Sequence, residues 1–194
     1  MNLKVKEIFY SLQGEGGRQG EASIFVRLSG CNMNCDFCDT DFDGGADMSC
    51  EQILSQIRHF LCQWIVWTGG EPTLQLTDKH LIFFKRAGYR QAIESNGSNP
   101  LSALLDYTVV SPKGNAEEAR KKNPRVDEIR IPIRKNDLIP TIESLPEAGN
   151  YMISPIFSDN PDETKENIDY CVQQIMRHTK WRLSLQMHKL IGIT

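Results

Sequence analysis

Three cysteines lie close together in the segment LSGCNMNCDFCDTDF, which covers residues 28–42. They are Cys31, Cys35 and Cys38, at the spacing C-x3-C-x2-C. Three thiolates can hold three irons of a cubane cluster and leave the fourth iron open to an external ligand. An incomplete set of cysteines would then be the functional feature of this segment.

Zinc is the competing metal for these cysteines. Structural zinc sites usually close with four ligands, commonly as two separated pairs. The nearest other candidates are Cys50 and His59, and neither makes the usual second pair. A chance group of loop cysteines is the third interpretation. Cys50, Cys62 and Cys171 lie in helical patterns, and we expect them to be core thiols.

Length and charge narrow the class of protein. The 194 residues predict one domain over residues 1–194, with a core large enough to need no disulfides. Lys plus Arg is 22 and Asp plus Glu is 25, so a net charge of −3 creates no overall attraction to nucleic acid or to an anionic membrane. The N-terminal segment lacks the apolar core of a signal peptide, and no apolar run approaches the about 18 residues of a membrane span. We therefore expect a cytoplasmic protein, in which clustered cysteines indicate a metal or catalytic site.

Short apolar, β-branched segments alternate with helical patterns along the chain. The expected strands cover residues 22–30, 63–72, 89–98, 106–114, 126–133 and 150–156. The expected helices cover residues 49–62, with a Ser49/Gln52 capping box, 77–88 and 162–179. This alternation predicts an α/β fold with a parallel sheet. Ligands of such sheets bind at the carboxyl ends of the strands, where the segments TGGEP, ESNG, SPK and SPIF lie.

The cysteine spacing, the aromatic Phe37 before the last cysteine, and TGGEP at residues 68–72 together resemble the radical S-adenosylmethionine enzymes. In those enzymes the open iron binds the amino and carboxylate groups of the cofactor. A glycine turn lets the backbone approach a ligand closely because glycine has no Cβ.

Further segments make the chain similar to one family of that superfamily, the 7-carboxy-7-deazaguanine synthases. These segments are EIFYSLQGEG, FVRLSGCN, CDTDF, TGGEPTLQ, ESNGS, VVSPK and LSLQMHKLIGI. The resemblance implies a compact, incomplete TIM-like barrel of mainly parallel strands, with the iron–sulfur cluster in the loop after the first strand. It also implies a homodimer that uses a 4Fe-4S cluster, S-adenosyl-L-methionine, Mg²⁺ and an external electron donor such as flavodoxin.

The same resemblance implies a reaction. A lyase of this family converts 6-carboxy-5,6,7,8-tetrahydropterin to 7-carboxy-7-deazaguanine, in a pathway that supplies queuosine for tRNA modification. Cleavage of S-adenosylmethionine by the reduced cluster gives a 5′-deoxyadenosyl radical, which abstracts hydrogen from C6 of the pterin. The ring then contracts, and ammonia is lost.

Site residues follow from the resemblance, position by position. The cluster ligands are Cys31, Cys35 and Cys38, and the magnesium ligand is Thr40. The expected S-adenosylmethionine contacts are Phe37, Cys38, Asp39, Gly70, Ser111, Pro112, Lys113, Ser154, Pro155, Ile156 and Phe157. The expected substrate contacts are Leu12, Gln13, Gly14, Arg27, Thr68 and Thr194.

Arg27 also has a physical argument, because its planar guanidinium suits the carboxylate that this substrate carries. A surface ion pair is the alternative for that residue. Two other classes of protein share part of the pattern. A glycyl-radical-enzyme activase would carry the same cysteine motif but act on a protein, and SLQGEG with the IGI tail argues against it. A non-catalytic zinc-binding module would leave TGGEP and the strand-end segments unexplained.

Overall fold

The computed structural model describes residues 1–193 and contains a nine-stranded sheet in the order β3-β1-β2-β4-β5-β6-β7-β8-β9. The strands are β1 (Asn2–Leu12), β2 (Ala22–Leu28), β3 (Ala46–Ser49), β4 (Trp64–Gly69), β5 (Arg90–Ser95), β6 (Tyr107–Val110), β7 (Arg125–Ile133), β8 (Glu147–Pro155) and β9 (Arg182–Leu183). Every neighbouring pair from β2 to β9 is parallel, whereas β1 runs antiparallel to both β2 and β3. The sheet is therefore mainly parallel, as the sequence predicts.

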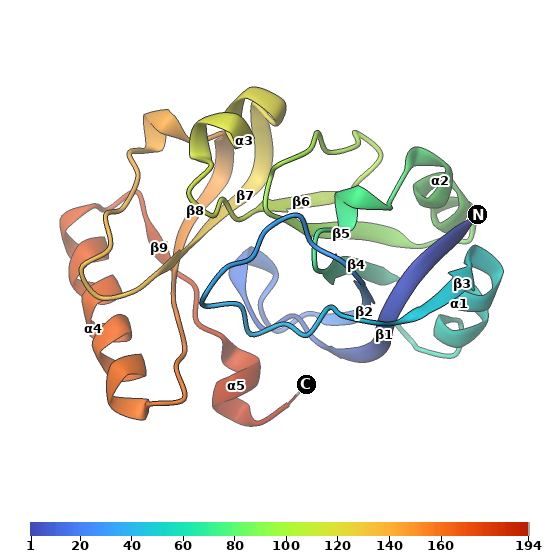
Figure 1. Ribbon diagram of the computed structural model, residues 1–194, viewed down its shortest axis with the longest axis horizontal. Coiled ribbons are helices and arrows are strands. Elements are labelled where there is room, and N and C mark those ends of the chain that lie inside the picture. Colours follow the sequence, from blue (N-terminus) through green and yellow to red (C-terminus); the bar gives the residue numbers. More distant parts are fainter. Residues whose placement is uncertain (194) are drawn as a thin grey trace.

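Helices surround the curved sheet, as Figure 1 shows. They are α1 (Cys50–Ile57), α2 (Asp78–Arg86), α3 (Ala116–Lys122), α4 (Pro161–Arg177) and α5 (Met187–Ile191), with short 3₁₀ helices at Gly16–Arg18, Pro72–Leu74 and Ile142–Ser144. β3 and β9 form the two edges of the sheet, so the barrel is incomplete, in agreement with the predicted fold class. Within residues 1–193, no helix has the length and apolar character required to cross a membrane.

Alternating side chains of β4 build two different cores. Ile65 and Trp67 are fully buried and pack in one cluster with Leu81 and Phe84 of α2. Val66 points to the other face, where it packs with Phe25 of β2 and Ala92 of β5 in a separate cluster. Both faces of the strand are apolar because helices cover one face and the barrel interior encloses the other.

Several sequence predictions need correction. The first strand is β1, which the sequence did not reveal because only Leu3 and Val5 are buried along its length. The cysteine loop consequently follows β2, the second strand, rather than the first. α3 was not predicted either, because five of its seven residues are charged. Cys62 lies beyond the end of α1 rather than in a helix.

The N-terminus of α1 confirms the predicted capping box. Ser49 Oγ accepts a hydrogen bond from the backbone N–H of Gln52 at 3.3 Å, and Gln52 Oε1 accepts one from the backbone N–H of Ser49 at 2.7 Å. Each bond satisfies an N–H that the helix itself leaves without a partner.

We expect Ser49→Ala to lower the free energy of unfolding by about 1 kcal/mol, because the N–H of Gln52 loses its acceptor. Ser49→Asp keeps an acceptor at the cap and should stay close to wild type. Urea denaturation followed by far-ultraviolet circular dichroism measures both changes. Equal stability of Ser49→Ala and wild type would contradict the role of the cap.

Candidate functional site

A cavity of about 420 Å³ opens at the carboxyl ends of the parallel strands. Its wall combines the turn after β1, the cysteine loop, the ends of β4, β5, β6 and β8, and α5. In a parallel α/β sheet this end is where ligands collect. The fold thus brings together segments that lie more than 170 residues apart, such as Gln13 and His188.

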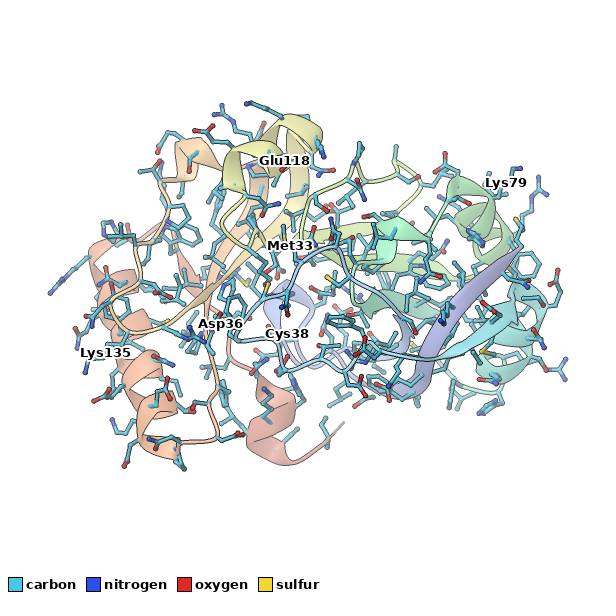
Figure 2. The ribbon with its side chains drawn as sticks, in the orientation of Figure 1. Met33, Asp36, Cys38, Lys79, Glu118 and Lys135 are labelled. Carbon is cyan, nitrogen blue, oxygen red and sulfur yellow. The ribbon has the colours of Figure 1, made fainter. Side chains whose placement is uncertain are left out.

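The three clustered cysteines all line this cavity, and each has a free thiol. Figure 2 shows Cys38 on the loop after β2, together with Met33 and Asp36. Burial raises the pKa of the Cys35 thiol, and the nearby Lys113 ammonium opposes that rise. The other three cysteines are separate from the cavity lining, with Cys50 and Cys171 buried in the apolar core.

The donor set fits a cubane cluster better than a single ion. Within residues 1–193, no three His, Cys, Asp or Glu side chains are grouped as ligands of one metal ion. A cubane has no such need, because each thiolate binds its own iron. Three thiolates on one short loop, all facing one cavity, satisfy that requirement.

Ion pairs attach the cysteine loop to three different parts of the barrel. The pairs are Lys6–Asp41 at 2.7 Å, Arg134–Asp36 at 2.8 Å and Lys189–Asp39. The hydrogen bond from Arg134 holds the pKa of Asp36 below its usual range, as the bond from Lys6 does for Asp41. Burial opposes ionisation of Asp39, yet its pKa is also lowered because Lys189 donates to it. Exposed ion pairs are individually weak, so the loop depends on several of them together.

The TGGEP segment lies directly against the start of the cysteine loop. Gly70 donates its N–H to the carbonyl of Leu28 at 3.1 Å, and a Cβ on Gly70 would meet the carbonyl oxygen of Gly30 at 1.9 Å. Only glycine permits this approach. Glu71 is fully buried and accepts hydrogen bonds from Ser95 Oγ at 2.9 Å and from the N–H of Asn96 at 2.7 Å. This carboxylate ties TGGEP to the neighbouring ESNG segment.

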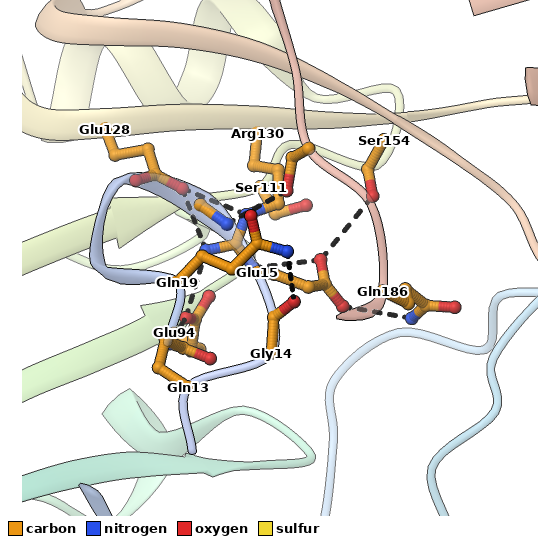
Figure 3. A network of polar contacts seen from close by, with 12 residues as sticks. Gln13, Gly14, Glu15, Gln19, Glu94, Ser111, Glu128, Arg130, Ser154 and Gln186 are labelled. Atoms are coloured by element: carbon orange, nitrogen blue, oxygen red, sulfur yellow. Dashed lines mark hydrogen bonds and ion pairs between the residues drawn. The ribbon is translucent and has the colours of Figure 1, made fainter. Parts of the chain in front are cut away.

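A network of charged groups, shown in Figure 3, borders the cavity, and Glu15, Glu94 and Arg130 are the members of it that line the cavity. The guanidinium of Arg130 on β7 pairs with Glu15 at 3.1 Å, with Glu94 at 3.1 Å and with Glu128 at 2.8 Å. Burial raises the pKa of Glu94, and the charge of Arg130 opposes that rise. Burial would lower the pKa of Arg130, but the three carboxylates outweigh it and raise that pKa.

The structure places most of the sequence-predicted site residues around this one cavity. The lining includes Leu12, Gln13, Gly14, Arg27, Phe37, Asp39, Thr40, Thr68, Gly70, Ser111, Lys113, Ser154, Pro155, Ile156 and Phe157, in addition to the three cysteines. Pro112 is buried beside it and does not line it. Thr194 lies outside the described residues. Arg27 lines the cavity, where we expect the substrate contact. It also pairs with Glu7 at 2.6 Å, which is the alternative ion pair.

Sequence reasoning missed Glu15, Glu94 and Arg130. Glu15 and Glu94 stand inside the quoted segments SLQGEG and ESNG, and the position of Glu94 at the end of a predicted strand could have identified it. Arg130 carries a weaker signal. In DEIRIPI, charged residues alternate with isoleucines, which indicates a strand with one polar face.

Comparisons with known proteins all find similarity to radical S-adenosylmethionine enzymes. The sequence profile of the Radical SAM superfamily matches residues 25–181. The 7-carboxy-7-deazaguanine synthase of Bacteroides thetaiotaomicron is 37% identical over 193 residues, covering 100% of both chains. The enzyme of the same name from Haemophilus influenzae is 40% identical over 199 residues, covering 99% of this chain and 94% of that one. Among solved structures, QueE from Escherichia coli superposes with a TM-score of 0.75 at 23% identity, over 97% of this chain and 95% of that chain, a likeness of fold.

The cysteines separate into two groups that a measurement can distinguish. We expect Cys35→Ala to lose iron and acid-labile sulfide after anaerobic reconstitution, because one iron of the cubane would lack its thiolate. Cys62→Ala should keep the wild-type content, since the Cys62 thiol is engaged with the carbonyl of Ala22 at 3.0 Å and is no part of the cavity lining. Full iron content in Cys35→Ala, or a colourless wild-type protein that binds zinc instead, would refute the cluster assignment.

Proposed function

We propose that this chain, which belongs to the radical S-adenosylmethionine superfamily and within it to the 7-carboxy-7-deazaguanine synthase family, is the lyase that converts 6-carboxy-5,6,7,8-tetrahydropterin to 7-carboxy-7-deazaguanine. The observation that carries the proposal is the convergence of the cysteine loop, TGGEP and the SLQGEG turn on one cavity. A zinc-binding module would need only the first of these segments.

The family's cofactors are a 4Fe-4S cluster and S-adenosylmethionine, which together supply a 5′-deoxyadenosyl radical. In our proposal Cys31, Cys35 and Cys38 hold the cluster. Gly70, Ser111, Lys113 and residues 154–157 line the cavity beside the cysteine loop, so we assign them to S-adenosylmethionine. Lys113 donates to Ser111 Oγ at 2.7 Å, which orders that side of the cavity.

The substrate has two chemically different ends. Its carboxylate suits Arg27, whose guanidinium would exchange part of its contact with Glu7 for the bound anion. Its aminopyrimidinone ring carries N–H donors, which need acceptors. Glu94 offers one, because its Oε1 accepts from Gln13 and Arg130, whereas its Oε2 has no partner among the described residues. We therefore place the pterin between Arg27 and Glu94.

We propose a homodimer in the cytoplasm that receives electrons from an external donor such as flavodoxin and supplies the queuosine pathway. We also propose that residues 1–194 act as one radical S-adenosylmethionine domain, a view supported by the continuous sheet from β3 to β9.

Anaerobic turnover tests the function directly. Reconstituted protein is incubated with the carboxylated tetrahydropterin, S-adenosylmethionine and dithionite, and products are identified by mass spectrometry. We expect 7-carboxy-7-deazaguanine and ammonia in equal amounts, with S-adenosylmethionine used catalytically because the loss of ammonia from this substrate is redox-neutral, and with Cys35→Ala as the inactive control. Cleavage of S-adenosylmethionine that leaves the pterin unchanged would contradict the proposed substrate.

Arg27→Ala should weaken pterin binding by roughly 2–5 kcal/mol, because the substrate carboxylate loses its charged partner in a partly enclosed site. Arg27→Lys should lose part of the affinity, since an ammonium cannot make the bidentate contact. Calorimetric titration of the pterin measures both, and uncoupled cleavage of S-adenosylmethionine should persist. The exposed Arg58, at the end of α1, provides the control Arg58→Ala. Unchanged affinity in Arg27→Ala would place the carboxylate elsewhere.

Thr40 lines the cavity two residues after Cys38. We propose that the Thr40 hydroxyl would help to hold Mg²⁺, an ion that prefers oxygen donors and would help to orient the substrate. Magnesium should then stimulate turnover far more than binding of S-adenosylmethionine. Thr40→Ala should lose most of that stimulation, and Thr40→Ser should keep much of it. Superimposable magnesium titrations for wild type and Thr40→Ala would show that this threonine has no part in metal binding.

A further inference from the structure

The charged wall of the cavity holds more negative than positive groups. Three carboxylates contact the one guanidinium of Arg130, and their exposed side-chain fractions are 17% for Glu15, 20% for Glu94 and 0% for Glu128. Burying ionised groups is costly, and well-packed apolar residues often stabilise a fold as well or better. An arrangement retained only for folding would not need this excess charge. Glu15 and Glu94 line the cavity, whereas Glu128 is fully buried outside the lining. The network therefore presents two carboxylates to the cavity, which points to a ligand that donates hydrogen bonds.

The three carboxylates differ in how many of their oxygens accept hydrogen bonds within the protein. Glu128 uses both oxygens, accepting from Arg130 with one and from Tyr107 and the N–H of Gly17 with the other. Glu15 also uses both, accepting from Gln186 and from Arg130. In residues 1–193, Oε2 of Glu94 is the carboxylate oxygen of this network that is left without a partner.

The glycines of SLQGEGG fit against this network. A Cβ on Gly16 would lie 2.2 Å from Glu128 Oε1 and 2.7 Å from a nitrogen of Arg130, and Gly16 has a φ of +76°. Gly17 donates its N–H to Glu128 at 2.7 Å. The turn can therefore pack its backbone directly on the ion pair only because both positions lack a side chain. The turn and the network form one unit.

We propose that Arg130 and Glu128 are positioning residues for substrate recognition, which hold Glu94 so that one free carboxylate oxygen faces the N–H edge of the pterin. This inference rests on the proposed function and deepens it. Glu128 fixes the guanidinium through Nε, and the guanidinium in turn fixes Glu94 through Nη2. Gln13 completes the support by donating to Glu94 at 2.9 Å.

The charged groups around Glu94 should make pterin binding dependent on pH. The groups that act on it are Arg130 and Glu128 from β7, Glu15 from the turn after β1, and Lys113 after β6. Burial raises the pKa of Glu94, Arg130 opposes this rise, and Glu128 adds to it. If the pterin requires the ionised carboxylate, affinity is full above this pKa and is lost as pH falls through it. Removing Arg130 should move that loss to higher pH, and neutralising Glu128 should move it to lower pH.

Binding of the carboxylated tetrahydropterin to the anaerobically reconstituted enzyme, measured by calorimetry across pH 5 to 9, tests the proposal. We expect Arg130→Met to lose at least about tenfold in affinity at neutral pH, close to 1.4 kcal/mol, and to recover part of it at high pH. Arg130→Lys keeps the charge and should lie between wild type and Arg130→Met. Arg125→Met, at the exposed start of the same strand, is the matched control. Binding of S-adenosylmethionine should be unchanged in all of them.

Glu128→Gln should shift the pH dependence of pterin binding in the direction opposite to Arg130→Met. It keeps the size of the side chain, and we expect its acid loss of affinity at lower pH than in wild type, whatever its effect on thermal stability. A purely structural role would reduce stability without moving the pH dependence in opposite directions for the two substitutions. Wild-type pH profiles in both Arg130→Met and Glu128→Gln would overturn the positioning role. Failure of the wild type to bind or convert the pterin would instead overturn the proposed function, and this inference with it.

Discussion

The contact between the Arg130 guanidinium and three carboxylates is the interaction on which the cavity depends. Glu15 belongs to the turn after β1, Glu94 to the end of β5, and Glu128 to β7. One buried cation on β7 therefore contacts two segments that are distant from it in sequence and holds the turn after β1 against the sheet. The glycines of the turn are required because its backbone lies against this pair.

The opposite side of the cavity is held in a different manner. The cysteine loop has no strand of its own between residues 29 and 45, and exposed ion pairs with Lys6, Arg134 and Lys189 connect it to the barrel. α5 and the residue before it contribute to both sides, since Lys189 of α5 pairs with the cysteine loop and Gln186 donates to Glu15 at 3.0 Å. A buried, charged wall thus faces a more exposed loop, an arrangement that fits the cluster we propose for that loop.

The sequence was sufficient to predict the parallel sheet, the capping box at Ser49 and the gathering of TGGEP and the cysteines at the strand ends. These features follow from local patterns, namely apolar alternation, capping residues and glycine turns. The antiparallel β1 escaped prediction because it has few buried side chains. The pairing of Arg130 with Glu15 and Glu94 escaped it because those two partners come from separate segments, and pairing over such distances leaves no periodic signal. The contact of Arg27 with Glu7 depends on the register of β1 against β2, which the sequence likewise does not reveal.

We propose that the pterin lies between Arg27 and Glu94, with its N–H edge at the carboxylate. A crystal structure of the reconstituted enzyme with S-adenosylmethionine and the carboxylated tetrahydropterin would test this placement. We expect a pterin nitrogen within about 2.7–3.2 Å of Glu94 Oε2 and the substrate carboxylate at Arg27. A pterin bound the other way round, with its carboxylate at the Arg130 network, would contradict it.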